Sequence, residues 1–112
     1  MKQFAVSIGP DEAAKITWDY VVSSGLSVEG VGNYRQVGPD GRAVVFLVFE
    51  KYFMRTSSRA SLSVVIENIT GITNVCFVGS GGGQNALFGF DWGAGGSFES
   101  LVEDSLARYV LR

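Results

Sequence analysis

The centre of the chain is a succession of strand patterns, and this succession limits the fold more than any other feature. Four segments are rich in β-branched and aromatic residues and are separated by short polar or glycine-containing turns. They span residues 27–37, 42–55, 60–67 and 74–78. Strands joined by such short connections pair with their neighbours, so the sequence predicts an antiparallel meander. Gly30 and Gly32 lie inside the first segment and predict a bulge or a close backbone approach there.

The two ends of the chain add helices to this meander. Residues 3–8 alternate as a half-buried strand, and Pro10 then suits the first turn of a helix that ends near Gly25. Ser97 is a typical N-cap for a second amphipathic helix, residues 98–110. The predicted order is β-α-β-β-β-β-α in a single α+β domain over residues 1–112, built as a two-layer sandwich with an antiparallel sheet. Residues 87–90 fit either an extra edge strand or an extended loop.

The third strand segment is apolar on both of its faces. Residues 43–49 read AVVFLVF, so both sides of the sheet need cover at this point. Helices supply one cover, and a partner chain, a ligand or a curled sheet supplies the other. The chain is 46% hydrophobic and only 18% charged, which is rich for a small monomer that must keep its surface wet. We therefore expect a homo-oligomer, with a dimer favoured.

The composition argues against several classes of function. The chain has no histidine and one cysteine, so histidine-based triads and thiolate zinc sites are not expected, and no metal or cofactor is predicted. Cys76 lies in an apolar strand and is expected to be an inert buried thiol. A net charge of −2 with scattered basic residues argues against nucleic-acid partners. The longest apolar run has seven residues and the N-terminal residues lack a signal sequence, so we expect no membrane partner and a cytoplasmic location.

The stretch GSGGGQNALFGFDWGAGG, residues 79–96, holds eight of the fifteen glycines. It follows a strand, as phosphate-binding loops do, but it matches neither the dinucleotide-binding nor the P-loop pattern. Three interpretations remain. The segment is a tight turn, or an anion-binding nest of exposed N–H groups, or an apolar surface for a partner subunit. The nest would use Gly79, Ser80, Gly81, Gly82, Gly83, Gln84 and Asn85, and the apolar interface would use Phe88, Phe90 and Trp92.

These features support a non-enzymatic binding or assembly domain that self-associates. The alternative is a small-molecule or anion-binding protein in which the loop at residues 79–85 forms one wall, because guanidinium groups beside aromatic rings suit planar or anionic ligands. The candidate lining residues are Arg35, Tyr52, Arg55, Arg59 and Trp92. A minor alternative is an enzyme that uses Glu50 or Asp91 as a base. No catalytic residue is assigned.

Three segments carry a resemblance to a known family. EKYFMRTSSRASLSVVIENI, GSGGG and FGFDWGAGGSF, followed by a C-terminal helix, resemble a family of small bacterial proteins that forms a domain of unknown function. The resemblance implies a small single-domain cytoplasmic protein and supplies no activity. The order of elements also resembles the TATA-binding-protein-like architecture, a fold analogy that does not imply DNA binding. A helix-grip fold, in which a curved sheet grips the last helix around a cavity, is the alternative.

Overall fold

The computed structural model describes residues 1–25, 27–54, 57–81 and 97–112. The chain runs β1-α1-β2-β3-β4-β5-α3, followed by a short 3-10 turn, and is therefore an α+β protein as predicted. The bounds are β1 Lys2–Val6, α1 Pro10–Val22, β2 Val28–Val37, β3 Ala43–Phe53, β4 Ser58–Glu67, β5 Thr73–Gly81, α3 Phe98–Leu106 and η2 Ala107–Tyr109.

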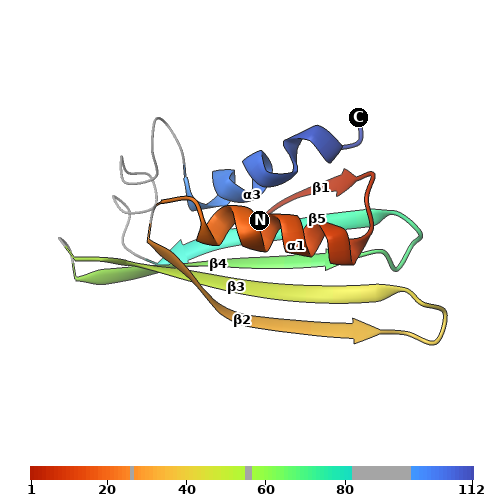
Figure 1. Cartoon of the computed structure of the whole chain (residues 1–112), viewed down its shortest axis with the longest axis horizontal. Helices are drawn as coiled ribbons and strands as arrows, with labels where there is room; N and C mark the ends of the chain where they lie inside the picture. The colour runs from red at the N-terminus through yellow and green to blue at the C-terminus, as the bar shows by residue number, and fades with distance from the viewer. Residues whose placement is uncertain (26, 55–56, 82–96) are drawn as a thin grey trace.

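The five strands form one antiparallel sheet in the order β1-β5-β4-β3-β2. The meander of β2 to β5 follows from the short turns between them, and β1 adds to β5 at the far edge. Both helices lie on the same face of the sheet (Figure 1), with α1 against β2, β3 and β4 and α3 against β4 and β5. The predicted antiparallel sheet with two helices is confirmed.

The hydrophobic core fills the space between the helices and this face of the sheet. Alternate residues of the central strands point into it, because successive side chains of a strand point to opposite faces. The largest of its fully buried apolar side chains are Phe49, Phe77, Phe98, Leu62, Ile66 and Leu106. One polar contact crosses this layer, between the hydroxyl oxygens of Thr17 and Ser105, which are 3.3 Å apart and join α1 to α3.

Local sequence signals explain where the helices begin. Pro10 occupies the first turn of α1, and Asp11 and Glu12 follow it at the positive end of the helix dipole. Ser97 caps α3 as predicted, since its side chain accepts a hydrogen bond from the Ser100 N–H while the Ser100 hydroxyl accepts one from the Ser97 N–H.

The sequence placed several element boundaries wrongly: β1 ends at Val6 and not at residue 8, α3 ends at Leu106 because residues 107–109 form a 3-10 turn, and β5 runs past residue 78. Pairing between β4 and β5 continues from Val78 through Gly79 and Ser80 to Gly81, so these three residues belong to β5 and not to a loop. Glycine permits this at residue 81, where φ is 82° and a β-carbon would lie only 2.7 Å from the Arg59 carbonyl oxygen. The predicted bulge in β2 is confirmed, because the register against β3 shifts between Gly30 and Gly32.

The C-terminal residues return to the outer edge of β1. The N–H of Ser7 donates to the Tyr109 carbonyl at 2.9 Å, and the N–H of Leu111 donates to the Ala5 carbonyl at 2.8 Å. Val6 and Val110 form a β-bridge between these two bonds. The two ends of the chain are therefore held together along one edge of the sheet.

Candidate functional site

The face of the sheet opposite the helices, which we call the open face, carries a contiguous group of apolar side chains. The group consists of Val44, Phe46 and Val48 of β3, Val65 of β4, and Cys76 and Val78 of β5. Phe46, Val65 and Cys76 are consecutive cross-strand partners and so lie side by side. Both helices are on the other face (Figure 1), and no other described element lies over this one.

The apolar character of β3 on both faces is confirmed. Val45, Leu47 and Phe49 are buried beneath the helices, while Phe46 on the open face keeps 37% of its surface exposed. Cys76, expected to be a buried thiol, is instead half-buried, because the odd-numbered residues of β5 point into the core and Cys76 points to the open face. Its thiol lies 3.7 Å from the Gln3 side-chain oxygen.

One end of the open face is polar and brings several predicted ligand-binding residues together. The guanidinium of Arg59 lies 5.5 Å from the centre of the Tyr52 ring, and its Nη1 lies 3.4 Å from Glu50 Oε1. The hydroxyls of Ser61 on β4 and Ser80 on β5 are 3.1 Å apart. A hollow of about 480 Å³ adjoins this end. It is lined by Ser27, Glu29, Glu50, Lys51, Tyr52, Met54 and Arg59.

The glycines at the end of β5 are not arranged as a free run of N–H donors. Gly79, Ser80 and Gly81 are paired with β4, and the N–H of Gly79 donates to Glu99 Oε2 at 3.0 Å. A carboxylate of the chain itself therefore accepts the first donor of the predicted nest. Gly82, Gly83, Gln84 and Asn85, and also Arg55, Phe88, Phe90 and Trp92, lie outside the described residues.

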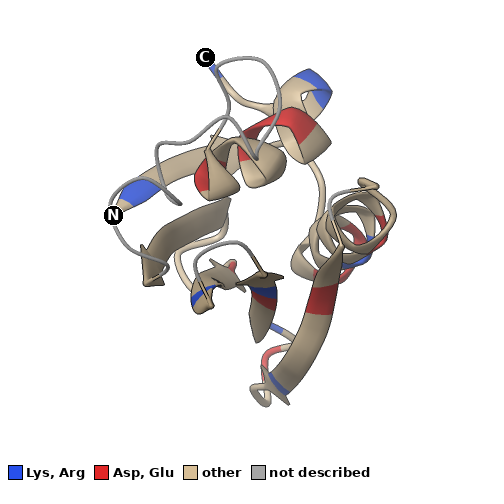
Figure 2. Ribbon diagram, turned by 90° about the vertical axis from the view of Figure 1, so that its left-hand side faces the viewer, with Lys and Arg blue, Asp and Glu red and all other residues tan. Residues whose placement is uncertain are grey.

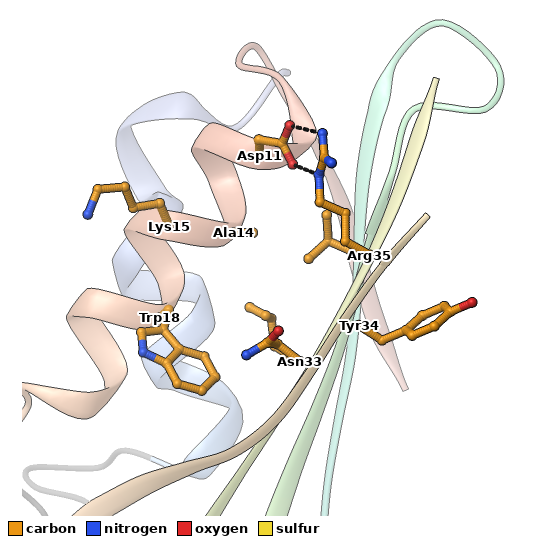
Figure 3. A pocket seen from close by; sticks show the side chains of 9 residues that line it. Asp11, Ala14, Lys15, Trp18, Asn33, Tyr34 and Arg35 are labelled. Atoms are coloured by element: carbon orange, nitrogen blue, oxygen red, sulfur yellow. Dashed lines mark hydrogen bonds and ion pairs between the residues drawn. The ribbon is translucent and has the colours of Figure 1, made fainter. Parts of the chain in front are cut away.

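A second concave site, the α1–β2 cleft, lies between the first helix and the edge strand (Figure 3). It has a volume of about 300 Å³. Its lining residues are Asp11, Ala14, Lys15, Trp18, Asn33, Tyr34, Arg35, Val45 and Leu47. Figure 3 shows Asp11 and Arg35 meeting across one end of the cleft, with Trp18 and Asn33 toward the other, while Tyr34 points away from it.

The ion pair across the cleft is bidentate. Nε of Arg35 donates to Asp11 Oδ1 at 2.7 Å and its Nη2 donates to Oδ2 at 2.8 Å. This hydrogen bonding is the main cause that holds the pKa of Asp11 below its usual value; burial acts in the opposite direction, and the charge of the guanidinium lowers the pKa further. Lys15, on the adjacent turn of α1, lies 2.7 Å from Asp19. Both cations at this site therefore have a carboxylate of α1 as a partner.

The other end of the cleft is aromatic. The ring of Trp18 packs over Gly30, where any larger residue would overlap with it, and lies 5.2 Å from the ring of Phe49. Asn33 faces α1 from β2, because the bulge after Gly30 sets the register that pairs it with Leu47. Asn33 makes no side-chain hydrogen bond within the described parts of the chain.

The predicted site residues therefore separate into two groups. Tyr52, Arg59 and Ser80 share the polar end of the open face, whereas Arg35 is on the helix-facing side of β2 and belongs to the cleft. Sequence reasoning did not find Asp11, Trp18 and Asn33. The predicted bulge at Gly30 was the available signal, because it marks the close approach of Trp18.

The carboxylates offer no clear catalytic grouping in the described ranges. Glu50 lies beside Arg59, and Asp91 is outside those ranges. Among the described residues, Cys76 and the aspartates and glutamates form no group of three that could hold a metal ion. Basic and acidic positions are both scattered along the ribbon (Figure 2). No helix in the described ranges has the length and apolar character that crossing a membrane requires.

Comparison with known proteins gives one match. A family model described as a family of unknown function (DUF6054) matches residues 1–110. No curated protein and no solved structure matches the chain.

Proposed function

The chain belongs to a family of unknown function, DUF6054, and we propose that it acts as a non-enzymatic binding domain that self-associates through the open face of its sheet. The observation that carries this proposal is the row of apolar side chains on β3 that points away from the helices. An antiparallel sheet with one solvated face normally presents polar residues there. Val44, Phe46 and Val48 break this rule in the middle of the sheet.

The size of the open face is consistent with a dimer. Five strands roughly 4.8 Å apart, over about six residues at roughly 3.4 Å each, give a face of roughly 24 by 20 Å. Two such faces in contact bury on the order of 1,000 Å² in total, which is near the lower limit for a specific interface. Face-to-face sheets pack about 10 Å apart with interdigitating side chains, and the uncharged middle of this face permits that.

The charges at its two ends favour a second copy as the occupant. Arg59 lies at one end of the open face and Glu67 at the other. If a two-fold axis lies in the interface and runs perpendicular to the strands, each Arg59 faces the Glu67 end of the second copy. Opposite charges then meet at both ends of the interface. Phe88, Phe90 and Trp92 remain candidate interface residues from the sequence.

Sedimentation velocity over a range of protein concentrations tests this proposal. We expect a dimer of the native chain and a monomer of Phe46→Lys. Tyr20→Lys is the matched control, because Tyr20 is 42% exposed on α1 and Phe46 is 37% exposed on the open face. If Phe46→Lys fails to fold, Val48→Thr replaces it. A native chain that stays monomeric at high micromolar concentration removes the proposal.

A second candidate function is anion binding at the polar end of the open face. It is favoured by Arg59, whose guanidinium is exposed, lies over the Tyr52 ring and has one 3.4 Å contact with Glu50 among the described residues, so N–H donors remain for a ligand. Thermal-shift measurements with inorganic phosphate, on the native chain and on Arg59→Gln, test this function. A phosphate-dependent rise in the melting temperature that is lost in the variant supports it. A carboxylate-based enzyme remains the minor alternative.

Three finer statements from the sequence are also proposals. The strand order with both helices on one face supports the analogy to the TATA-binding-protein-like architecture, and it suits a helix-grip fold as well. A bacterial origin and a cytoplasmic location rest on the sequence resemblance and on the composition.

A further inference from the structure

We propose that the α1–β2 cleft binds a small, neutral aromatic molecule that carries a carboxamide or an equivalent donor–acceptor edge. The cleft lies on the helix side of the sheet, so this inference is independent of self-association through the open face. It rests on the shape of the cleft, its charge balance and its unused hydrogen-bonding groups.

The shape of the cleft selects a small flat ligand. Its volume of about 300 Å³ is at the lower end of the range for small-molecule sites. The wall on the α1 side is formed by Ala14 and the Trp18 ring, and Val45 and Leu47 form an apolar floor from β3. An aromatic ring entering between helix and strand meets aliphatic groups and the indole, a combination that favours planar apolar surfaces.

The charges of the cleft select a neutral ligand. Arg35 is held by two hydrogen bonds to Asp11, and Lys15 is paired with Asp19. A carboxylate or phosphate ligand would have to compete with Asp11 for the same guanidinium. A cationic ligand would lie beside Arg35. An uncharged ligand incurs neither penalty, because it leaves the ion pair in place.

Two polar groups remain available to orient such a ligand. The side-chain amide of Asn33 has both a donor and an acceptor, and no described residue uses either. Arg35 uses two of its five N–H donors on Asp11, so three are left for a carbonyl oxygen. A carboxamide provides the matching acceptor and donor, whereas a plain hydrocarbon ring leaves Asn33 without a partner.

The test compares three probes with the same ring and different charge: benzamide, benzoate and benzamidine. Titrations are followed by two-dimensional 1H–15N NMR of the whole chain. We expect benzamide to bind with a dissociation constant of about 1 mM or tighter, and the charged probes to bind about tenfold more weakly or worse. The shifted signals should include the indole N–H of Trp18 and the side-chain amide of Asn33.

Two variants and one control connect this binding to the cleft. Ala14→Leu fills the apolar wall without removing a polar group and should abolish binding. Asn33→Ala should weaken it by about tenfold, as expected for the loss of a hydrogen bond to the ligand. Gln36→Ala, on the same strand but pointing to the open face, should bind like the native chain.

Benzamide binding by the folded proteins decides the proposal. If Ala14→Leu does not fold, the comparison of Asn33→Ala with Gln36→Ala carries the test. The proposal is overturned if the folded native chain shows no benzamide-dependent shift at Trp18 or Asn33. It is also overturned if benzoate binds as tightly as benzamide, since the site then selects anions.

Discussion

The indole ring of Trp18 lies against the backbone of Gly30, so close that even a methyl group at position 30 would overlap with it. This contact joins α1 to the edge strand β2 at the point where the register of β2 shifts. The same ring contacts Phe49 in the core, which is the cross-strand partner of Gly30. The contact therefore fixes how closely the helix approaches the edge of the sheet and forms one end of the α1–β2 cleft.

Replacing this glycine should destabilise the protein. In Gly30→Ala the Trp18 ring must move or β2 must shift, and overpacking of this kind costs about 1–3 kcal/mol of unfolding free energy. Chemical denaturation followed by tryptophan fluorescence measures the effect. Gly32→Ala is the matched control on the same strand, because a β-carbon there would make only an ordinary contact with Val48. Equal stability of the two variants would contradict the role assigned to Gly30.

The buried hydroxyl pair between the helices should behave as a coupled unit. The Ser105 hydroxyl donates to the Val102 carbonyl at 2.8 Å, so the 3.3 Å contact is best satisfied by donation from Thr17. Thr17→Val and Ser105→Ala should each destabilise the fold, and the double variant should lose about 1 kcal/mol less than the sum of the two. A double-mutant cycle by urea unfolding checks this. Strict additivity would show that the hydroxyls do not interact.

The Asp11–Arg35 pair should show itself in the pH dependence of stability. Because Arg35 lowers the pKa of folded Asp11 below the ordinary value of about 3.9, the pair stabilises the fold at neutral pH. That contribution is lost as the pH falls through the folded pKa. Arg35→Gln should return the Asp11 pKa toward its ordinary value in a 13C NMR titration of the carboxyl group. Arg108→Gln removes an arginine that does not line the cleft and should leave the Asp11 pKa unchanged. The pairing is wrong if both variants titrate like the native chain.

Cys76 offers a chemical measure of self-association. Its thiol is half-buried within the open face, so a second copy packed on that face would shield it. The rate of its reaction with a disulfide reagent should fall about tenfold when the protein concentration rises from well below to well above the dissociation constant. In Phe46→Lys the rate should not depend on concentration. A concentration-independent rate in a native chain that sedimentation shows to be a dimer would place the interface elsewhere.

The sequence predicted those parts of the fold that depend on local signals. The two apolar faces of β3, the cap at Ser97 and the bulge near Gly30 are each set by residues close in sequence, and each is present. The end of β5 was missed, because glycine favours loops locally and only cross-strand pairing with β4 extends the strand to Gly81.

The site was less predictable than the fold for the same reason. Asp11 and Arg35 are 24 positions apart and meet only because α1 packs across the edge strand, so no spacing rule connects them. Arg35 was grouped with Tyr52 and Arg59 as a ligand-binding residue, yet strand register puts it on the opposite face. Which face a strand residue occupies beyond a bulge depends on the register shift, and the sequence indicates the bulge without fixing that shift.

The bridge between Val6 and Val110 has a consequence for how the sheet can grow. With the C-terminal residues bonded to Ala5 and Ser7, the end of the outer edge of β1 around Val6 is closed to another strand. Of the two edge strands, β2 is then the more accessible to a strand from another chain. Its bulge, however, interrupts the regular hydrogen-bond ladder that such pairing requires. Both edges of the sheet thus hinder the repeated strand addition that builds fibres, whereas the open face stays available for a closed dimer.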